Sequence, residues 1–244
     1  YSYIAPRSYF DTNVIGTLNI LNASLKRQIE VIHTSTSEVY GTPQNIPIKE
    51  THRLFAQSPY AASKISADQL AISYFNSFNL PVCIIRPFNT FGPRQSLRAI
   101  IPTIITQMLN DKIKKIKLGN THTTRDFSYI TDTVDGFLKT FNKDKIFGEV
   151  INLGTGKEIS INNIAKIIAE LTRQTKKIIN EDKRVRTKKS EITRLCSSNL
   201  KAKKLLKWRP KYKSQSELKI AIKKTIDWYK QNKNQFKKSK IYNL

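Results

Sequence analysis

A tyrosine and a lysine at positions 60 and 64 have the spacing of an acid/base pair. Four residues apart on a helix, Tyr60 and Lys64 share one face, which brings an ammonium close to a phenol. A nearby positive charge favours the ionised phenol, so Lys64 is expected to lower the pKa of Tyr60 toward the range of a general base. Taken alone, this spacing is more often a chance pair, because both residue types are common here.

A second polar group lies upstream, directly after an apolar segment at residues 31–34. It consists of Thr36, Ser37 and Glu38, which bring two hydroxyls and a carboxylate together. Open α/β sheets build their sites at the carboxyl ends of parallel strands, so residues 36–38 are predicted to face a site. The alternative is a polar turn between a strand and a loop, closed by Gly41.

Two units of helix and strand must position these groups. Residues 8–26 carry one apolar stripe at helical spacing, and the short strand at residues 31–34 follows. Residues 58–79 are a second predicted helix, started by a serine and a proline, and residues 82–85 are a buried strand. This alternation is typical of a parallel sheet covered by crossover helices.

The rest of the chain continues the alternation without an internal repeat or a low-complexity linker. The fold class is therefore α/β, and the second half is expected to form a smaller lobe interleaved with the first. Further helices are expected near residues 101–110, 132–141, 161–172, 199–206 and around Leu218–Tyr229, with strands near residues 116–118 and 149–152.

The chain has 244 residues, 43 Lys and Arg against 18 Asp and Glu, and a net charge of +25. The excess is uneven, with +19 in residues 157–244 and +6 in residues 1–156. A basic balance favours anionic partners, but 31 of the 43 cations are lysines spread along helical stretches, which is also typical of a solvated surface. Nothing in the composition indicates a disordered or collagen-like chain.

Two further features bear on the compartment. Cys83 and Cys196 stand far apart and match no metal-ligand spacing, so a reduced, cytoplasmic location is expected and no metal site is predicted. No apolar run approaches the roughly 18 residues that a membrane span needs, so no membrane partner is expected.

The motifs together resemble the extended short-chain dehydrogenase/reductase family, in particular its NAD-dependent nucleotide-sugar 4,6-dehydratases. The resemblance covers essentially the whole chain. The decapeptide at residues 86–95, followed by residues 101–105, looks most like UDP-N-acetylglucosamine 4,6-dehydratases of the legionaminic acid type. The matching motifs are Thr36-Ser37-Glu38, Tyr60 with Lys64, residues 86–95, residues 124–132, residues 152–156, and Arg186 ahead of Ser190-Glu191.

The resemblance implies a cofactor, NAD, and a set of catalytic residues. Tyr60, helped by Lys64 and Thr36, is expected to take the proton of the sugar 4-hydroxyl while hydride leaves C4. Glu38 is expected to take the C5 proton that the resulting ketone acidifies. Water then leaves from C6 and hydride returns there, which yields a 4-keto-6-deoxy sugar.

Ser37 departs from the pattern, because many sugar dehydratases carry Asp at this position to protonate the leaving hydroxyl. A serine hydroxyl is a poor acid. The similar Thr-Ser-Glu of GDP-mannose dehydratases implies that Glu38 acts twice or that a water relays the proton.

The family's binding roles also fall on matching positions. By resemblance, the cofactor contacts are Ser35, Tyr60, Lys64 and Pro87. A diphosphate suits the bidentate fork of arginine. The residues expected to bind the nucleotide-diphosphate sugar are Asn89, Arg94, Arg125, Arg186 and Glu191.

Family members begin with a strand and a Gly-x-x-Gly-x-x-Gly turn that binds the dinucleotide pyrophosphate. The 244 residues hold no such turn. By this comparison residues 1–150 correspond to the C-terminal part of an NAD-binding Rossmann-like domain, and residues 151–244 mainly to the nucleotide-sugar lobe. We expect a fragment that lacks about 80 N-terminal residues, binds NAD weakly and is inactive by itself.

Other interpretations of the sequence stay open. A nucleotide-sugar 4-epimerase or decarboxylase would keep Tyr60 and Lys64 but give Glu38 no chemical task, and dTDP-glucose is an alternative substrate. The basic C-terminal region could instead make the chain a module that binds RNA or another polyanion, although such binding needs a continuous basic stripe with exposed aromatic rings. The helices at 8–26 and 58–79 resemble those that pair in a homodimer in this family.

Overall fold

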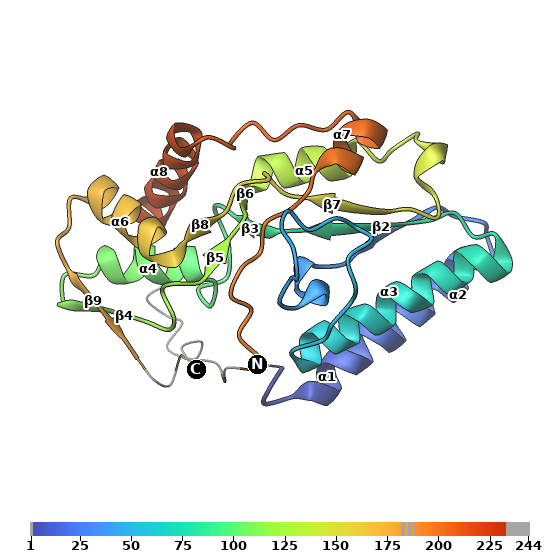
Figure 1. Cartoon of the computed structure of the whole chain (residues 1–244), viewed down its shortest axis with the longest axis horizontal. Helices are drawn as coiled ribbons and strands as arrows, with labels where there is room; N and C mark the ends of the chain where they lie inside the picture. Colours follow the sequence, from blue (N-terminus) through green and yellow to red (C-terminus); the bar gives the residue numbers. More distant parts are fainter. Residues whose placement is uncertain (1, 182–183, 185–186, 188, 233–244) are drawn as a thin grey trace.

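The computed structural model describes residues 2–181, 184, 187 and 189–232, and all structural statements refer to these residues (Figure 1). The helices are α1 (Pro6–Phe10), α2 (Gly16–Leu25), α3 (Pro59–Phe78), α4 (Ile100–Met108), α5 (Ile130–Leu138), α6 (Ile161–Thr172), α7 (Leu200–Leu206) and α8 (Gln215–Gln231), with a π-helical turn η1 (Asp11–Ile15) and 3-10 turns η2 (Ser37–Tyr40) and η3 (Asp144–Ile146). The strands are β1 (Val31–Thr34), β2 (Val82–Pro87), β3 (Asn89–Phe91), β4 (Lys115–Leu118), β5 (Thr124–Arg125), β6 (Phe127–Tyr129), β7 (Val150–Leu153), β8 (Ile159–Ser160) and β9 (Lys177–Asn180).

A parallel sheet of β1, β2 and β7 lies at the centre of the first core, in the order β1-β2-β7. Side chains alternate across this sheet. Val82 and Ile84 pack toward α2 and α3, whereas Cys83 and Ile85 pack toward α7 and Trp208. Helices therefore cover both faces (Figure 1), which confirms the predicted partial Rossmann-type α/β fold.

Helix α3 has the boundaries that its sequence predicts. Ser58 caps it by accepting a hydrogen bond of 3.1 Å from the Ala61 amide, and Pro59 occupies the first turn. The helix ends at Asn79, whose φ of 53° is left-handed. Tyr60 and Lys64 consequently lie in its first turns, beside the carboxyl end of β1.

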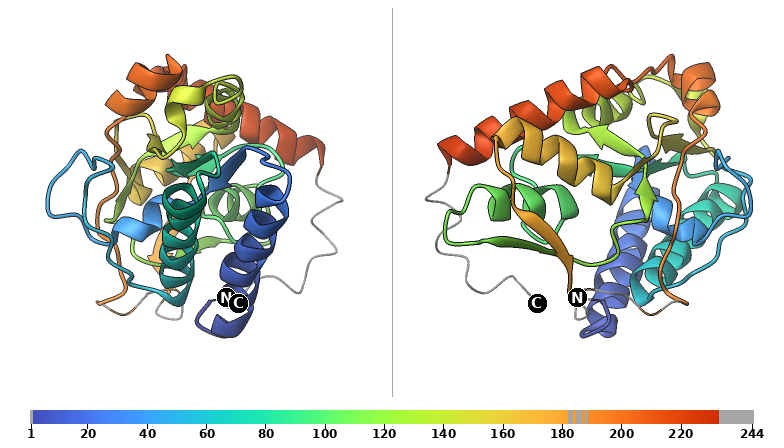
Figure 2. Two further views of the ribbon diagram at one scale, coloured as in Figure 1. Left: turned by 90° about the vertical axis from the view of Figure 1, so that its right-hand side faces the viewer. Right: turned by 60° about the vertical axis from the view of Figure 1, so that its left-hand side comes forward.

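The helix predicted at residues 8–26 is one helical stretch that contains the π turn η1 between α1 and α2. It lies beside α3 in both views of Figure 2, and the Asn13 amide donates to the Ser63 hydroxyl at 2.9 Å. Leu21 is fully buried in this contact. Phe10 is 39% exposed and Phe78 is 50% exposed, so the apolar faces of the two helices continue beyond their contact.

A second core is built around α4, α6 and α8, and α6 contacts both other helices. Its apolar side chains include Ile104, Ile164 and Ile222, and the parallel pair of β4 and β9 closes one side. The chain passes between the two cores several times. In chain order, α4 and β4 belong to the second core, β7 to the first, α6 to the second, α7 to the first and α8 to the second. The second lobe is thus interleaved with the first sheet.

No described helix has both the length and the apolar character that crossing a membrane requires.

Candidate active site

The turn η2 and its N-cap carry one predicted catalytic group, residues 36–38, and place it next to Tyr60 of the other. Thr36 is its N-cap, and its hydroxyl accepts a hydrogen bond of 3.3 Å from the Glu38 amide. The same Thr36 side chain is hydrogen-bonded to the phenol of Tyr60, and the Glu38 carboxylate is close enough to act on the Tyr60 pKa. The structure therefore brings Thr36, Glu38 and Tyr60 together where β1 ends and α3 begins.

The pKa of Tyr60 departs from the sequence-based expectation. Burial raises it, the hydrogen bond to Thr36 opposes this, and the negative charge of Glu38 raises it again. The lowering expected from Lys64 is wrong for this structure, because the pKa of Tyr60 is raised. The Lys64 ammonium donates a hydrogen bond to the carbonyl of Thr34. Burial also lowers the pKa of Lys64, against the charge of Asp68.

Beside this cluster lies a cavity of about 350 Å³. Of the predicted site residues that the structure describes, four line it, namely Glu38, Asn89, Arg125 and Glu191. Glu38 is therefore the residue that the cavity and the Thr36–Tyr60 cluster share.

Three arginines line this cavity, and the sequence analysis anticipated one of them. Arg125 is buried, donates to the Thr124 carbonyl at 2.9 Å, and lies 3.6 Å from a Glu191 carboxylate oxygen. Arg98 and Arg184 also line the cavity. Arg98 lies just beyond the decapeptide motif at residues 86–95, so extending that motif would have predicted it. No motif in the sequence predicts a role for Arg184.

Several predicted residues lie elsewhere. Arg94 is exposed, has a left-handed backbone with φ 64°, and does not line the cavity, so its place at the phosphates stays a prediction. The hydroxyl of Ser35 donates to Asp68 at 2.8 Å in the interior, and its contact with the cofactor stays a prediction. Pro87 ends β2 and is half-buried, and Ser37 is buried in η2. Arg186 lies outside the described residues.

The glycine-containing turn at residues 152–156 has its amides occupied. Asp126 is completely buried and accepts hydrogen bonds from the Thr155 amide and hydroxyl and from the Gly156 and Ser197 amides. Burial raises the pKa of Asp126 to about 6, although these hydrogen bonds oppose the shift. An internal carboxylate thus fills the place that a phosphate would take in a nucleotide-binding turn.

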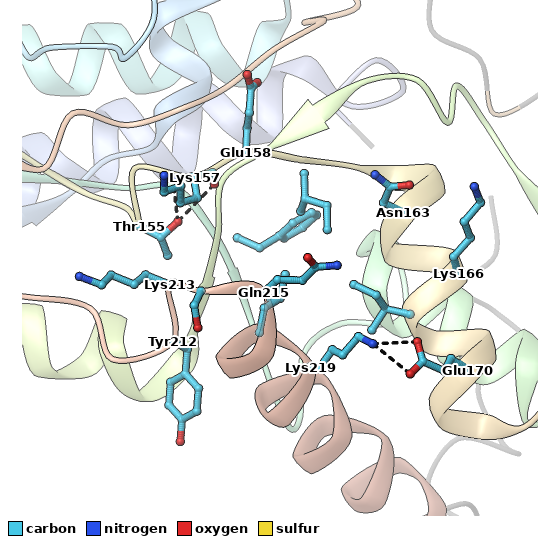
Figure 3. Close-up of a pocket in the computed structure, with 15 residues that line it drawn as sticks. Thr155, Lys157, Glu158, Asn163, Lys166, Glu170, Tyr212, Lys213, Gln215 and Lys219 are labelled. Atoms are coloured by element: carbon cyan, nitrogen blue, oxygen red, sulfur yellow. Dashed lines mark hydrogen bonds and ion pairs between the residues drawn. The ribbon is translucent and has the colours of Figure 1, made fainter.

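A second cavity, of about 530 Å³, lies between α6 and the start of α8 (Figure 3). Lysines surround it, and Lys219 is paired with Glu170 at 2.9 Å. Phe127 lines both cavities. Of the predicted site residues within the described part of the chain, none lines this second cavity.

Comparison with known proteins places this geometry in a family. The model of the family described as GDP-mannose 4,6 dehydratase matches residues 1–220. Human dTDP-D-glucose 4,6-dehydratase is 32% identical over 239 residues, which are 97% of this chain and 67% of that protein. A putative UDP-glucose 4-epimerase of Methanocaldococcus jannaschii is 32% identical over 91% of this chain and 70% of its own.

A solved structure gives the same result. The dTDP-glucose 4,6-dehydratase of Bacillus anthracis, determined in complex with NAD, is 31% identical and superposes with a TM-score of 0.84 over 93% of this chain and 70% of its own. The chain thus spans about two thirds of the length of the curated relatives it matches. It belongs to the extended short-chain dehydrogenase/reductase family, among the nucleotide-sugar dehydratases and epimerases.

Proposed function

We propose that the protein is an NAD-dependent nucleotide-sugar 4,6-dehydratase, with UDP-N-acetylglucosamine as its substrate. The observation that carries the proposal is the position of Glu38. Its carboxylate is shared between the Thr36–Tyr60 cluster and the arginine-lined cavity. A dehydratase needs a base for the C5 proton at this place, whereas a 4-epimerase leaves the carboxylate without a task.

The cavity suits a diphosphate. Arg98, Arg125 and Arg184 surround it, and a guanidinium binds phosphate oxygens through two parallel hydrogen bonds. The Glu191 carboxylate beside Arg125 keeps that guanidinium in place. Asn89 adds an amide to the lining, which supports its proposed contact with the sugar.

The residues at the start of α3 fit NAD. The Lys64 ammonium has three N–H donors, and the Thr34 carbonyl takes one of them, so donors remain for ribose hydroxyls. Tyr60 and Lys64 would hold the nicotinamide end of the cofactor, near the half-buried Pro87. When bound, NAD supplies the capacity to accept hydride from C4 and to return it to C6.

The chain's own groups carry the proton transfers. Tyr60 takes the proton of the 4-hydroxyl, and its hydrogen bond to Thr36 stabilises the phenolate that this step needs. Glu38 takes the C5 proton once C4 is a ketone. The 6-hydroxyl leaves with a proton as water, and the buried Ser37 is a poor source of that proton. Glu38, which now carries the C5 proton, is the acid we assign to it. When hydride returns to C6, C5 takes a proton that comes from the solvent through Glu38, and Tyr60 releases the proton of the former 4-hydroxyl to the solvent.

Replacing Glu38 tests the proposal. The 244 residues hold no glycine-rich turn for the NAD pyrophosphate and are proposed to be inactive by themselves, so the assay uses this chain joined to such a dinucleotide-binding segment. With a UDP-sugar and NAD in deuterated water, that protein, called the parent, should form a 4-keto-6-deoxy product that carries deuterium at C5. Glu38→Gln should lower this turnover by about 10²–10⁴-fold, because the base is lost. The matched control is Glu170→Gln, which removes a carboxylate of the second cavity and should leave turnover unchanged. A Glu38→Gln protein with the parent's rate, or a parent that only inverts C4, would make the dehydratase assignment wrong.

The identity of the nucleotide, UDP, is the more specific part of the proposal. The curated and structural relatives include dTDP-glucose dehydratases, so dTDP-glucose is the second candidate. Calorimetric titration with UDP and with dTDP decides between them. Tighter binding of UDP supports our choice, and tighter binding of dTDP replaces it.

We also propose a homodimer that packs the exposed apolar faces of the helices at residues 8–26 and α3. Phe10, Ile15, Ile20 and Phe78 are between 39% and 61% exposed there. Sedimentation equilibrium should give twice the chain mass, and Ile20→Glu should give the monomer mass. A cytoplasmic location is proposed because Cys83 and Cys196 are free, buried thiols.

The RNA-binding alternative receives no support from Trp208 and Tyr229 of the basic C-terminal region, whereas Trp228 is half-buried. Trp208 and Tyr229 are at most 2% exposed. Neither ring can therefore stack on a base as single-stranded binding requires.

A further inference from the structure

An ion pair that the proposed chemistry does not use lies directly beneath η2. The Asp68 carboxylate, on α3, accepts from the Arg86 side chain at 2.9 and 3.1 Å. Both residues are buried, with Asp68 at 0% and Arg86 at 3% exposure. The pair joins the helix that carries Tyr60 and Lys64 to the end of strand β2.

The same pair holds both ends of η2. On one side, Ser35, which immediately precedes Thr36, donates to Asp68 at 2.8 Å. On the other side, the third nitrogen of Arg86 donates to the Tyr40 hydroxyl at 3.0 Å. Tyr40 is the last residue of the turn and is fully buried. Thr36 and Glu38 therefore lie between two anchors that meet at a single guanidinium and carboxylate.

The network continues to the third strand of the sheet. The Tyr40 hydroxyl donates to the Asn152 amide oxygen at 2.7 Å, and the guanidinium carbon lies 5.0 Å from the Tyr40 ring centre. His33, on β1, places a ring nitrogen 3.2 Å from Asp68. The pair is thus tied to all three strands and to α3.

Stability alone does not account for such a pair. Desolvation offsets most of the attraction in a buried ion pair, and apolar residues of similar volume are often as stable. What apolar residues cannot supply is direction: a carboxylate and a planar guanidinium fix each partner at a defined angle and distance.

We propose that Asp68 and Arg86 are a positioning pair that fixes η2, and so holds Thr36 and Glu38 against Tyr60. Neither residue touches the substrate cavity. The catalytic meaning of the pair rests on the proposed function, whereas its effect on the order of η2 does not.

Arg86→Lys is the first test, because lysine keeps the charge opposite Asp68 but has no planar fork to hold Asp68 and Tyr40 in fixed directions. We expect kcat to fall about tenfold or more, with the KM for the nucleotide sugar within about threefold, because the binding arginines are untouched. Amide hydrogen exchange of residues 36–40 should become faster. The matched control is Asp132→Asn, another buried carboxylate, which holds the amides of Lys211 and Tyr212 and should change neither kcat nor exchange in η2.

Tyr40→Phe is the second test and decides the matter if Arg86→Lys does not fold. It keeps the buried ring and removes only the hydroxyl between Arg86 and Asn152. Faster exchange across residues 36–40, with kcat reduced by about threefold or more, supports the pair. Unchanged exchange in a folded variant overturns it. A parent protein that dehydrates no nucleotide sugar refutes the proposed function instead, and exchange then decides on the pair alone.

Discussion

Asp68 and Asp126 are both completely buried, yet their surroundings shift the pKa in opposite directions. Burial tends to raise the pKa of Asp68, but the close contact of His33, the charge of Arg86 and the hydrogen bond from Ser35 outweigh it, so the pKa is lowered. Asp126 is held by neutral amides and a hydroxyl, and burial raises its pKa to about 6. A cation beside the carboxylate separates the two cases.

The two carboxylates also hold different kinds of structure. Asp126 fixes backbone: it joins the turn at residues 152–156 to Ser197, two segments far apart in sequence. Asp68 fixes side chains on both sides of the turn that carries Thr36 and Glu38. Neutral donors suffice to close a loop, whereas the region next to the proposed chemistry uses a charged pair with defined directions.

The largest expected effect comes from removing the cation of the charged pair. Arg86→Met leaves the carboxylate of Asp68 buried without its counter-charge, and breaking a buried pair in this way costs about 3–5 kcal/mol of unfolding free energy. Urea unfolding followed by circular dichroism measures the loss. Adding Asp68→Leu to the same protein should recover most of it, since the double variant no longer buries a charge. An Arg86→Met protein within about 1 kcal/mol of the parent would contradict the comparison.

What the sequence predicts well is local. The cap at Ser58, the spacing of Tyr60 and Lys64, and the polar run after β1 are all read within a few residues, and each lies where its pattern indicates. Short-range patterns determine helix starts and the ends of parallel strands, so the region of the candidate site could be predicted.

What the sequence does not reveal is contact between distant segments. Asp68 looks like an ordinary polar position of a helix, and its partners lie 18 residues away at Arg86 and 33 residues away at Ser35. The family resemblance places Ser35 at the cofactor, and its position at the end of a strand does not reveal that its hydroxyl donates to Asp68. The two-residue strands β5 and β8 are too short to show a period of two.

Asp126→Asn tests the buried carboxylate that is held by neutral donors. Asparagine replaces one carboxylate oxygen with an NH2 group, which faces N–H and O–H donors and cannot accept from them. We therefore expect the free energy of unfolding near neutral pH, measured in urea, to fall by about 1–3 kcal/mol. A pKa raised from 3.8 to about 6 means that the folded protein binds this proton more tightly than the unfolded chain does. The stability that Asp126 contributes is therefore greatest at low pH and is lost as the pH rises through about 6. The difference between parent and variant should widen between about pH 7 and about pH 4.5; a difference that narrows would show that the pKa of Asp126 is not raised.

The smallest change in unfolding free energy is expected for an exposed carboxylate. Asp135 pairs with Lys139 at 3.1 Å on α5, with side chains 42% and 36% exposed. Water and salt screen such a pair, so Asp135→Asn should change the unfolding free energy by only about 0.3–0.5 kcal/mol, and the effect should disappear in about 1 M salt. The variant carries the same change of Asp to Asn as Asp126→Asn and differs from it only in surroundings. Equal losses in the two variants would mean that the residue type, and not the burial and partners of each carboxylate, decides the cost. Urea midpoints of both proteins, measured at low and high salt, distinguish these outcomes.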